Sequence, residues 1–400
     1  MLAGKKVLLG VTGGIAAYKS TFLVRLLIHQ GATVKVVMTD SAKQFVSPLT
    51  LSTLSQHPVY YDFVDEKKGE LSWNNHVELA KWADIFLIAP LTSNTLAKMV
   101  SGACDNLLLA AYMSSSCKVF VAPAMDLDMY AHEATKQGLA LLEQRKVTVI
   151  KAATGFLASG LEGEGRMAEP ETIIAEIQTM LSSELSLYGK KVLITAGPTR
   201  EPLDPVRFFS NYSTGTMGYE LALKAHALGA EVTLISGPVA PIHLPASIRR
   251  IAIETAEQMY QQVMIYFDDA DFFISSAAVA DYTFSEVHDQ KIKKKEETLV
   301  LKLQRTKDIL QEVMKRKSRQ RVIGFSLESD DDQNKPLEKL RTKGLDAIVY
   351  NTLLDKGAGF GTTTNKATLF FADQTQSAIP LQSKASMAEV LWGHFTNKWG

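Results

Sequence analysis

The chain has 400 residues, of which 46% are hydrophobic, so it can form two or three domains with sizeable cores. Its 43 basic and 43 acidic residues cancel, which argues against a nucleic acid or a membrane surface as the main partner. No apolar run approaches the ~20 residues of a membrane span, and the two cysteines, Cys104 and Cys117, indicate neither a disulfide framework nor a metal cluster. We predict a cytoplasmic protein.

Apolar runs alternate with helical patterns along the first half of the chain. Residues 6–10, 34–38, 83–90 and 119–123 have the length and composition of buried strands. Because helical patterns lie between them, the sequence predicts an α/β fold of Rossmann-like, three-layer domains, each with a mainly parallel sheet covered on both faces.

The second half of the chain repeats this plan. Gly4-Lys-Lys-Val-Leu-Leu returns as Gly189-Lys-Lys-Val-Leu-Ile, and the later strands have counterparts in the same order. We therefore predict two similar domains at residues 1–181 and 189–400, joined by a linker at residues 182–188.

A long polar loop distinguishes the second half. Residues 196–218 follow an apolar run and contain three prolines and three glycines among charged and hydroxyl side chains. At the carboxyl end of a strand, such a loop presents backbone N–H groups and polar side chains to a ligand. Its candidate ligand-binding side chains are Arg207, Asn211, Ser213 and Thr214.

Glycines and hydroxyl side chains follow the first-half strands. Thr12-Gly13-Gly14 opens a helix, where free N–H groups and the helix dipole can hold a phosphate. The spacing is not the G-x-G-x-x-G of dinucleotide-binding folds, although Asp40 after the second strand could bind a ribose. Thr39 and Ser41 beside it could bind phosphate or cap the next helix.

His76 and two polar segments are further candidates. His76 opens a helix and shares a face with apolar residues, as a structural histidine would, but a helix amino terminus disfavours the imidazolium and suits a neutral base. Residues 89–98 end a strand with hydroxyl and amide side chains. Residues 155–170 are rich in glycine and could form a flap over a site or a disordered surface loop.

These motifs carry a family resemblance over nearly the whole chain. The first half resembles the flavin-containing phosphopantothenoylcysteine decarboxylases in Gly13-Gly14, His76-Val-Glu-Leu, Ser93-Asn94-Thr95, Asp105-Asn106-Leu107-Leu108, Pro123-Ala-Met125 and Gly165-Arg166-Met167. The second half resembles phosphopantothenate-cysteine ligase in Gly197-Pro-Thr-Arg, Asn211-x-Ser-x-Gly, Ala277-Ala-Val-Ala-Asp281, Lys291-Ile-Lys-Lys294 and Lys339-x-x-x-Lys343. The order of the two halves is that of the bacterial bifunctional enzymes of coenzyme A biosynthesis.

The resemblance implies two reactions on small-molecule substrates. CTP, favoured over ATP by the bacterial members, activates 4'-phosphopantothenate as an acyl-nucleotide, which L-cysteine attacks to form an amide. FMN-dependent decarboxylation then gives 4'-phosphopantetheine, because oxidation of the thiol towards a thioaldehyde provides an electron sink. The resemblance also implies Mg²⁺ with the triphosphate and a homo-oligomer built from decarboxylase trimers and ligase dimers.

The resemblance also implies roles for residues of the decarboxylase half. His76 would act in proton transfer, and Ser159 occupies the position of the proton donor. The FMN-binding positions are Thr12, Gly13, Gly14, Ile15, Thr39, Ser41, Ser93, Asn94, Thr95 and Asp105. The substrate-binding positions are Met125, Asp126, Arg166, Met167 and, in the second half, Arg207.

Two first-half positions depart from the family pattern. Asp126 stands where the family has Asn, and a carboxylate there would repel the substrate carboxylate. Ser159 stands where the family has Cys, and a hydroxyl is a far weaker acid than a thiol. We expect a working decarboxylase with a changed proton donor. The alternatives are a flavin-binding regulatory protein with an impaired decarboxylase half and a nicotinamide-dependent reductase, which the missing glycine fingerprint disfavours.

In the ligase half, the resemblance implies that Asn211 stabilises the acyl intermediate and that Lys291 is catalytic. Asp281 would bind the nucleotide or its metal ion. The nucleotide-binding positions are Ser275, Ser276, Ala277, Asp281, Lys291, Lys307, Asp308, Ile309, Leu310, Phe325, Lys339 and Lys343. Thr216 replaces a family lysine, and Lys307 is the candidate to restore the lost positive charge.

Overall fold

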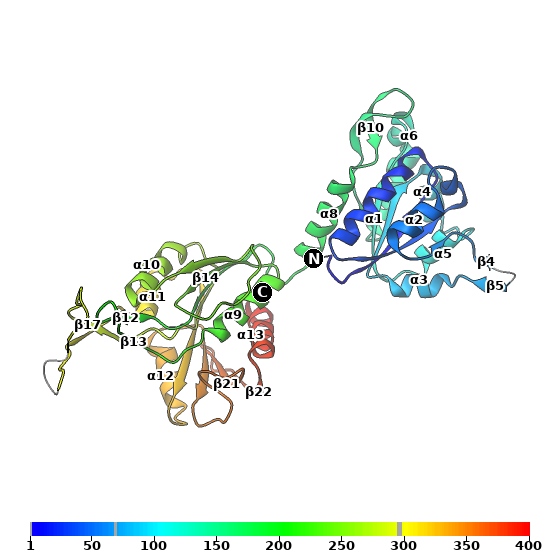
Figure 1. The fold of residues 1–400 in the computed structure, drawn as a ribbon. Helices are drawn as coiled ribbons and strands as arrows, with labels where there is room; N and C mark the ends of the chain where they lie inside the picture. Colours follow the sequence, from blue (N-terminus) through cyan, green and yellow to red (C-terminus); the bar gives the residue numbers. More distant parts are fainter. Residues whose placement is uncertain (1, 68–69, 294–297) are drawn as a thin grey trace. The chain divides into compact units, whose positions relative to one another are not determined.

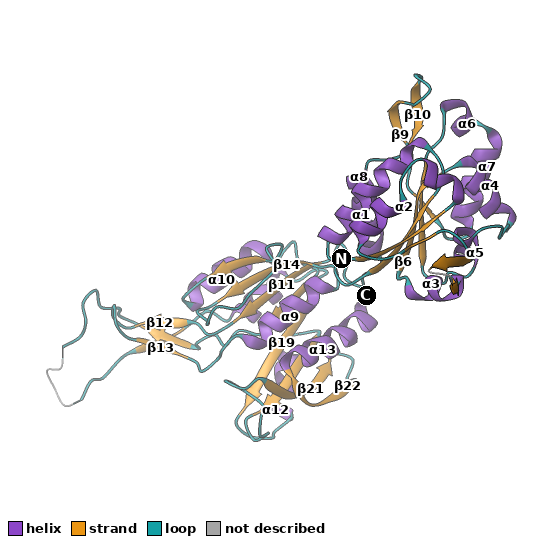
Figure 2. Cartoon of the chain, turned by 45° about the vertical axis from the view of Figure 1, so that its right-hand side comes forward, coloured by secondary structure: helices purple, strands orange, loops and turns teal. Residues whose placement is uncertain are grey.

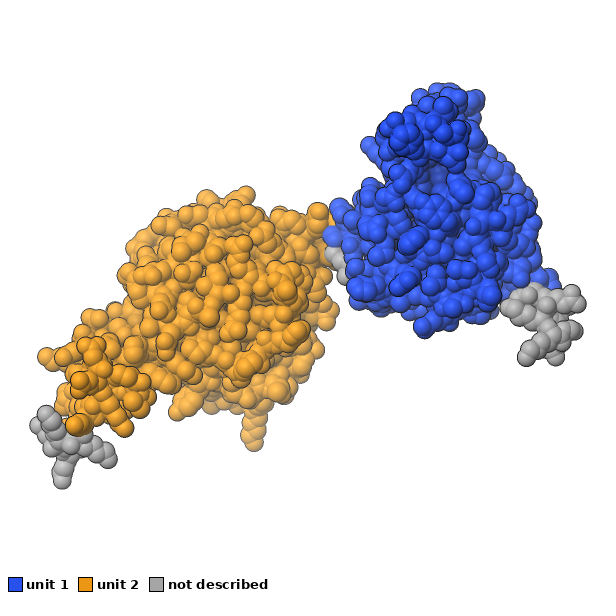
Figure 3. Space-filling view, turned by 45° about the horizontal axis from the view of Figure 1, so that its top comes forward, with its two compact units in different colours: residues 1–182 blue, residues 183–400 orange. Residues whose placement is uncertain are grey.

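The protein folds into two compact units, Met1–Ser182 and Ser183–Gly400 (Figure 3). The computed structural model describes residues 2–67, 70–293 and 298–400, so Lys294 of the predicted lysine motif lies outside the described residues. Each unit is built on a mainly parallel sheet with helices on both faces (Figures 1 and 2). The predicted α/β fold class is confirmed.

Six parallel strands form the sheet of the first unit, in the order β3-β2-β1-β6-β7-β8. They are β1 (Lys6–Val11), β2 (Thr33–Met38), β3 (Val59–Tyr60), β6 (Ile85–Leu91), β7 (Lys118–Pro123) and β8 (Thr148–Val149). The order reverses between β1 and β6, and ligands of doubly wound folds bind outside the carboxyl ends of the strands at such a point.

Helices cover both faces of this sheet because side chains alternate along each strand. Leu9 of β1 belongs to one core with Leu23, whereas Leu8 belongs to the opposite core with Leu108. The helical elements are η1 (Ile15–Lys19), α1 (Ser20–His29), η2 (Asp40–Gln44), α2 (Pro48–Ser55), α3 (His76–Trp82), α4 (Ser93–Ser101), α5 (Leu107–Met113), α6 (Leu127–Ala131), α7 (Glu133–Gln144) and α8 (Pro170–Ser183).

The glycine-rich segment predicted as a flap is an antiparallel hairpin of β9 (Ala153–Phe156) and β10 (Glu162–Arg166). It projects from the body of the first unit (Figure 2). Gly165, at φ +141°, lies so close to the loop after β7 that an added Cβ would sit 2.5 Å from the Met125 carbonyl oxygen. A second hairpin, β4 (Val64–Lys67) and β5 (Glu70–Trp73), precedes α3.

The second unit has an eight-stranded sheet in the order β15-β14-β11-β16-β19-β20-β21-β22. Its first six strands are parallel in the same arrangement as the first unit, and the last two run antiparallel. The strands are β11 (Lys191–Ala196), β14 (Glu231–Ser236), β15 (Arg249–Ala252), β16 (Phe272–Ser275), β19 (Arg321–Glu328), β20 (Ala347–Thr352), β21 (Thr364–Phe371) and β22 (Gln376–Ser383). The helices are α9 (Thr216–Ala227), α10 (Ala256–Tyr266), α11 (Ile309–Arg316), α12 (Asn334–Thr342) and α13 (Lys384–Trp399).

Part of the long loop after β11 is folded into a hairpin that the sequence does not indicate. Its strands are β12 (Arg200–Pro202) and β13 (Phe208–Ser210), beside a second ribbon of β17 (Tyr282–Phe284) and β18 (Leu303–Arg305). The buried Asp204 carboxylate organises the turn, because it accepts the N–H groups of Val206, Arg207 and Ile292 and pairs with the Arg207 guanidinium. These bonds hold the pKa of Asp204 well below its ordinary value, chiefly through Arg207.

We predict that Gly218→Ala destabilises the second unit, because helix α9 crosses the end of β11 at this residue. A Cβ there would lie 2.6 Å from both the Ala196 Cβ and the Ser276 Oγ, and overpacking of this kind costs about 1–3 kcal/mol. Urea denaturation followed by tryptophan fluorescence measures the loss. The matched control is Gly393→Ala in α13, where an added Cβ meets nothing within 4 Å. An equal loss in both variants would contradict the prediction.

Candidate functional site

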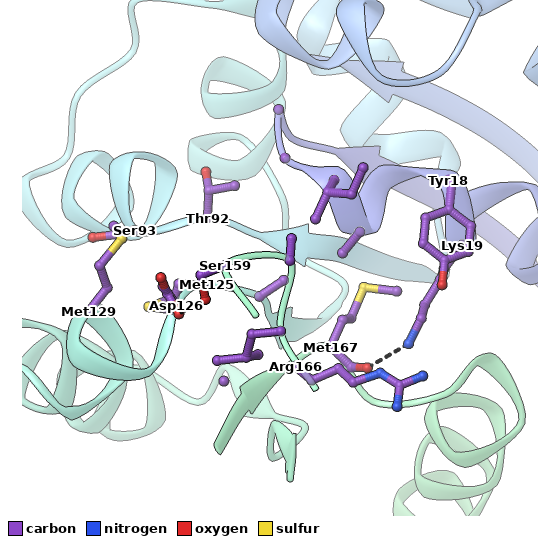
Figure 4. Close-up of a pocket in the computed structure, with 18 of the residues that line it drawn as sticks. Tyr18, Lys19, Thr92, Ser93, Met125, Asp126, Met129, Ser159, Arg166 and Met167 are labelled. Atoms are coloured by element: carbon purple, nitrogen blue, oxygen red, sulfur yellow. Dashed lines mark hydrogen bonds between the residues drawn. The ribbon is translucent and has the colours of Figure 1, made fainter. Parts of the chain in front are cut away.

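A large cavity of the first unit lies at the carboxyl ends of β1, β6 and β7 (Figure 4). Its volume of about 750 Å³ is within the range of small-molecule sites. Predicted flavin, substrate and proton-donor positions that line it are Gly13, Gly14, Ile15, Ser41, Ser93, Asn94, Met125, Asp126, Ser159, Arg166 and Met167. The flap hairpin supplies part of the wall, so the strand ends and the flap share one site.

Buried threonines hold the polar loops of this cavity together. The Thr12 hydroxyl donates to the Pro90 carbonyl at 2.7 Å and accepts the Thr92 N–H at 3.1 Å, which ties the loop after β1 to the loop after β6. Thr39 bonds to the Ser41 hydroxyl at 3.3 Å, and the Thr92 hydroxyl donates to Thr95 at 3.3 Å. Thr12, Thr39 and Thr95 were predicted to bind FMN, but they support the lining residues and do not line the cavity themselves.

Backbone N–H groups at the start of α4 have no side-chain cap. Thr92 is the N-cap residue, and its side chain makes no capping bond to the helix. The first N–H groups of a helix lack partners within the helix and attract anionic or carbonyl oxygens. Ser93 and Asn94 therefore present donors to the cavity that they line, whereas the Thr92 N–H is already bonded to Thr12. Thr92 was missed in the sequence, although it directly precedes the predicted Ser93.

Asp126 and Ser159, the two positions that depart from the family pattern, contact one another. The Ser159 hydroxyl donates to Asp126 Oδ1 at 2.9 Å, and the Leu127 N–H donates to the same oxygen at 2.8 Å. Figure 4 shows both side chains beside Met125 in the cavity wall. Within the described residues, no lysine, arginine or histidine forms an ion pair with Asp126. The cavity therefore carries a half-buried carboxylate without a cationic partner.

A buried lysine joins the flap to the body of the unit. Lys19, 3% exposed, donates to the Met167 carbonyl at 2.9 Å and to Glu169 at 3.0 Å. Arg166 donates to the same Glu169 oxygen at 2.7 Å. Sequence reasoning missed Lys19, because nothing in the pattern distinguishes it from an exposed lysine.

His76 lies outside this cavity. It opens α3 as predicted, and Asn75 caps the helix by accepting the Val77 and Glu78 N–H groups. The imidazole makes edge contacts with Phe63 and Trp73 at centroid distances of 6.1 and 6.2 Å. Its buried Nδ1 has no hydrogen-bond partner in the described part of the chain, a costly state for a polar atom.

Asp105 also lies away from the cavity lining. Its carboxylate pairs with Lys98 at 2.5 Å and accepts a bond from Asn106 at 3.0 Å. The hydrogen bond from Lys98 lowers the pKa of Asp105. The single chain does not bring His76 and Asp105 to the cavity that contains Asp126 and Ser159.

The second unit has a polar cavity of about 590 Å³ beyond the end of β16. Most predicted nucleotide-binding residues line it: Ser275, Ala277, Asp281, Lys307, Asp308, Ile309, Leu310, Phe325, Lys339 and Lys343. Asp308 caps α11 and pairs with Lys343 at 2.6 Å. Burial opposes its ionisation, but the hydrogen bonds from Lys343 and the Gln311 N–H prevail, and the pKa of Asp308 is lowered.

Two lysines of this cavity are already engaged. Lys339 donates to the Phe325 carbonyl at 3.1 Å, and burial, followed by the nearby Lys343, lowers its pKa. Lys307 pairs with Glu257 at 3.0 Å and lies 4.4 Å from the ring centre of Tyr260. The hydrogen bond with Glu257 raises the pKa of Lys307. The positive charge that Lys307 brings to the cavity wall is therefore balanced by the Glu257 carboxylate.

An adjoining cavity of about 330 Å³ contains Asn211, Ser276 and Thr216. It shares Ala277, Val279 and Phe325 with the larger cavity. Asn211 donates to the carbonyls of Ala278 and Val279 at 3.1 and 3.3 Å, which fixes its amide group.

Arg207 and Lys291 line neither cavity. Arg207 was predicted to bind substrate, but its guanidinium is held by Asp204 and by the Ile292 carbonyl at 3.1 Å. Lys291 is exposed on the segment that Asp204 anchors at Ile292.

In the described parts of the chain, no helix combines the length and the apolar character of a membrane span.

Comparison with known proteins gives a family for each unit. Residues 1–182 match the family model "Flavoprotein", and residues 187–398 match "DNA/pantothenate metabolism flavoprotein C-terminal domain". The "Coenzyme A biosynthesis bifunctional protein CoaBC" of Bacillus subtilis (strain 168) is 43% identical over 394 residues, which cover 98% of this chain and 97% of that protein. The chain belongs to this bifunctional family. The expectation drawn from its motifs is confirmed.

Other relatives include a protein with a different name. A "Cysteine/Cysteine sulfinic acid decarboxylase" from an unknown prokaryotic organism is 45% identical over 348 residues, covering 86% of this chain and 96% of that protein. Among solved structures, the C-terminal domain of a coenzyme A biosynthesis bifunctional protein CoaBC is 36% identical, covers 54% of this chain and 98% of that chain, and has a TM-score of 0.47.

We predict that the Asp308–Lys343 pair makes stability depend on pH. The pKa of Asp308 is lowered in the folded protein, so its contribution is complete well above the unfolded value of about 4 and is lost as the pH falls through the folded value. Asp308→Asn keeps a good N-cap and should lose no more than about 1 kcal/mol at neutral pH, because the pair is partly exposed. Urea denaturation from pH 7 to pH 3 should show that the difference between variant and wild type shrinks as the pH falls below about 4. A constant difference would contradict the assignment.

Proposed function

We propose that the protein converts 4'-phosphopantothenate and L-cysteine to 4'-phosphopantetheine in two reactions of coenzyme A biosynthesis. Residues 189–400 perform the ligation, and residues 1–181 perform the decarboxylation, with residues 182–188 as the linker. The observation that carries the proposal is the match to bifunctional relatives along almost the whole chain, in both units. The cavities at the strand ends of each unit support it.

The first-unit cavity fits FMN by the chemistry of its donors. The uncapped start of α4 and the Ser41 hydroxyl offer hydrogen bonds to phosphate or to flavin carbonyl oxygens, and Ile15 and Met125 offer an apolar surface to the rings. Gly13 fits closely against the Ser41 segment, since an added Cβ would lie 2.3 Å from Ser41 Oγ. Bound FMN would supply two-electron redox chemistry at the carbon that carries the substrate thiol.

His76 reaches this chemistry from a neighbouring subunit of a homo-oligomer. Its position outside the cavity of its own chain and its unpartnered, buried Nδ1 support this arrangement. In that place the imidazole would orient the substrate carboxylate and move a proton. Asp105 would reach the flavin of the neighbour in the same way.

Ser159 takes the proton-donor position at the flap. Its hydroxyl is a poor acid on its own, but it already donates a hydrogen bond to Asp126. Asp126 holds the Ser159 hydroxyl in place by accepting this bond, so the two residues act together at the proton-donor position. Arg166 and Met167 complete the substrate wall.

In the second unit, the larger cavity binds CTP. Lys339 and Lys343 would offset the phosphate charge, and Asp281 would be the protein residue that holds a Mg²⁺ ion there. The described residues contain no group of three or more His, Cys, Asp or Glu side chains able to hold a metal ion, so most ligands of that ion come from the nucleotide and water. Asn211 would stabilise the acyl-nucleotide from the adjoining cavity, and Lys291 would supply positive charge to the reaction.

We predict that His76→Asn stops the second reaction but not the first. With 4'-phosphopantothenate, cysteine and CTP, the wild type should give 4'-phosphopantetheine, whereas the variant should accumulate phosphopantothenoylcysteine with decarboxylation at least about 100-fold slower. Mass spectrometry measures both products, and the absorption spectrum checks that flavin is retained. His132→Asn is the control, since His132 is an exposed N-cap on α7. Unchanged decarboxylation in His76→Asn would refute the role of His76.

A second candidate function for the first unit is decarboxylation of a thiol amino acid that has a free ammonium group. Asp126 favours it, because an unpaired carboxylate attracts the ammonium, which offsets its repulsion of the carboxylate that both substrates carry. The relative named as a cysteine and cysteine sulfinic acid decarboxylase supports it as well. In phosphopantothenoylcysteine the same nitrogen is an uncharged amide.

This candidate predicts that the wild type converts cysteine to cysteamine and carbon dioxide. Asp126→Asn should reduce the rate with cysteine about tenfold or more and raise the rate with phosphopantothenoylcysteine. The uncharged Asn side chain neither attracts the cysteine ammonium nor repels the substrate carboxylate. Mass spectrometry of cysteamine and 4'-phosphopantetheine measures both rates on one enzyme preparation. If the wild type leaves cysteine unchanged, the second candidate fails and the coenzyme A function is unaffected.

A further inference from the structure

A buried lysine in the second unit lacks a counter-charge. Lys384 is the first residue of α13 and is 5% exposed. Its ammonium donates one hydrogen bond, to the Gly359 carbonyl at 3.2 Å, and forms no ion pair with a carboxylate of the described residues. Burying an ammonium without a counter-charge is unfavourable, and this burial lowers the pKa of Lys384. An anionic ligand would offset that cost.

The ammonium belongs to the wall of the smaller cavity, and it is the only charged side chain among the described residues that line this cavity. The other polar groups there suit an anion. Ser213, Thr214 and Thr216 contribute hydroxyls, and the two threonine hydroxyls lie 3.0 Å apart.

Helix α9 starts at the same cavity with free donors. Its N-cap, Gly215, has no side chain to bond the first N–H groups of this 12-residue helix. Because Thr216, Met217 and Gly218 all line the cavity, the amino terminus of α9 adds oriented N–H groups and a positive dipole end to the site. A buried cation, hydroxyl groups and a helix amino terminus therefore meet in one small volume.

We propose that Lys384 and the start of α9 bind the phosphate monoester of the ligation substrate, while the nucleotide occupies the larger cavity. This inference rests on the proposed ligase function. Two anionic reactants must be held at once, and the two cavities share Ala277, Val279 and Phe325, so a substrate anchored at Lys384 can extend its carboxylate towards the nucleotide. Lys384 thus provides the positive charge that Thr216 lacks.

Binding measurements without turnover test this assignment. In isothermal titration calorimetry, Lys384→Met should weaken 4'-phosphopantothenate binding about tenfold or more, because a charge-assisted hydrogen bond is lost. CTP binding should change less than about twofold, and pantothenate, which lacks the phosphate, should bind wild type and variant alike. Lys366→Met is the matched control, since Lys366 lies on β21, is half exposed and pairs with Asp355 at 2.7 Å.

Two results would overturn the assignment. One is unchanged 4'-phosphopantothenate affinity in Lys384→Met, and the other is an equal loss of CTP and 4'-phosphopantothenate binding, as a purely structural lysine would give. If Lys384→Met does not fold, inorganic phosphate must compete with 4'-phosphopantothenate on the wild type, and Lys384→Arg must retain binding; failure of either overturns it. Wild type that binds 4'-phosphopantothenate but makes no amide refutes the ligase function alone.

Discussion

The parallel register of the central strands is the constraint on which both sites depend. In the first unit, β1 pairs with β2 on one side and with β6 on the other, so the loops after these strands leave the sheet at one edge. In the second unit, β11 pairs with β14 and β16 in the same way. The helices that connect strands on one side of the reversal point cover one face of the sheet, and those on the other side cover the opposite face. A crevice therefore opens at the carboxyl ends of the strands where the strand order reverses.

In both units, hydrogen bonds between neighbouring loops stabilise the carboxyl end of the sheet, although different residues make these bonds. In the first, the Thr12 hydroxyl joins the loops after β1 and β6. In the second, the Ser276 hydroxyl donates to the Thr195 carbonyl at 2.8 Å, and the Ala278 N–H donates to Gly197 at 2.9 Å, which joins the loops after β11 and β16. Both arrangements satisfy polar groups locally and leave the outward N–H groups and hydroxyls available to a ligand.

The sequence predicts the strands and the loops that follow them better than it predicts where individual charged side chains lie. Apolar runs predict the strands, and polar residues in the segments that follow a strand, such as Ser93 and Asp281, line cavities. Charged side chains with long stems are different, because partners distant in sequence decide where they point. Asp204 holds Arg207 away from both cavities of the second unit, whereas Lys384, with nothing unusual around it in the sequence, is buried in the wall of one.

The departures from the family pattern bear on whether the first unit is active or decayed. Loss of selection would replace Asn and Cys independently and would leave no reason for the new side chains to complement one another. Here the Ser159 hydroxyl satisfies the Asp126 carboxylate across 33 residues of sequence, and the flap glycine Gly165 still fits against Met125. A serine without the aspartate would be a weak acid, and an aspartate without the serine would be a half-buried charge with one fewer donor. The hydrogen bond makes the two changes a coherent pair, which favours altered chemistry or an altered substrate over loss of the site.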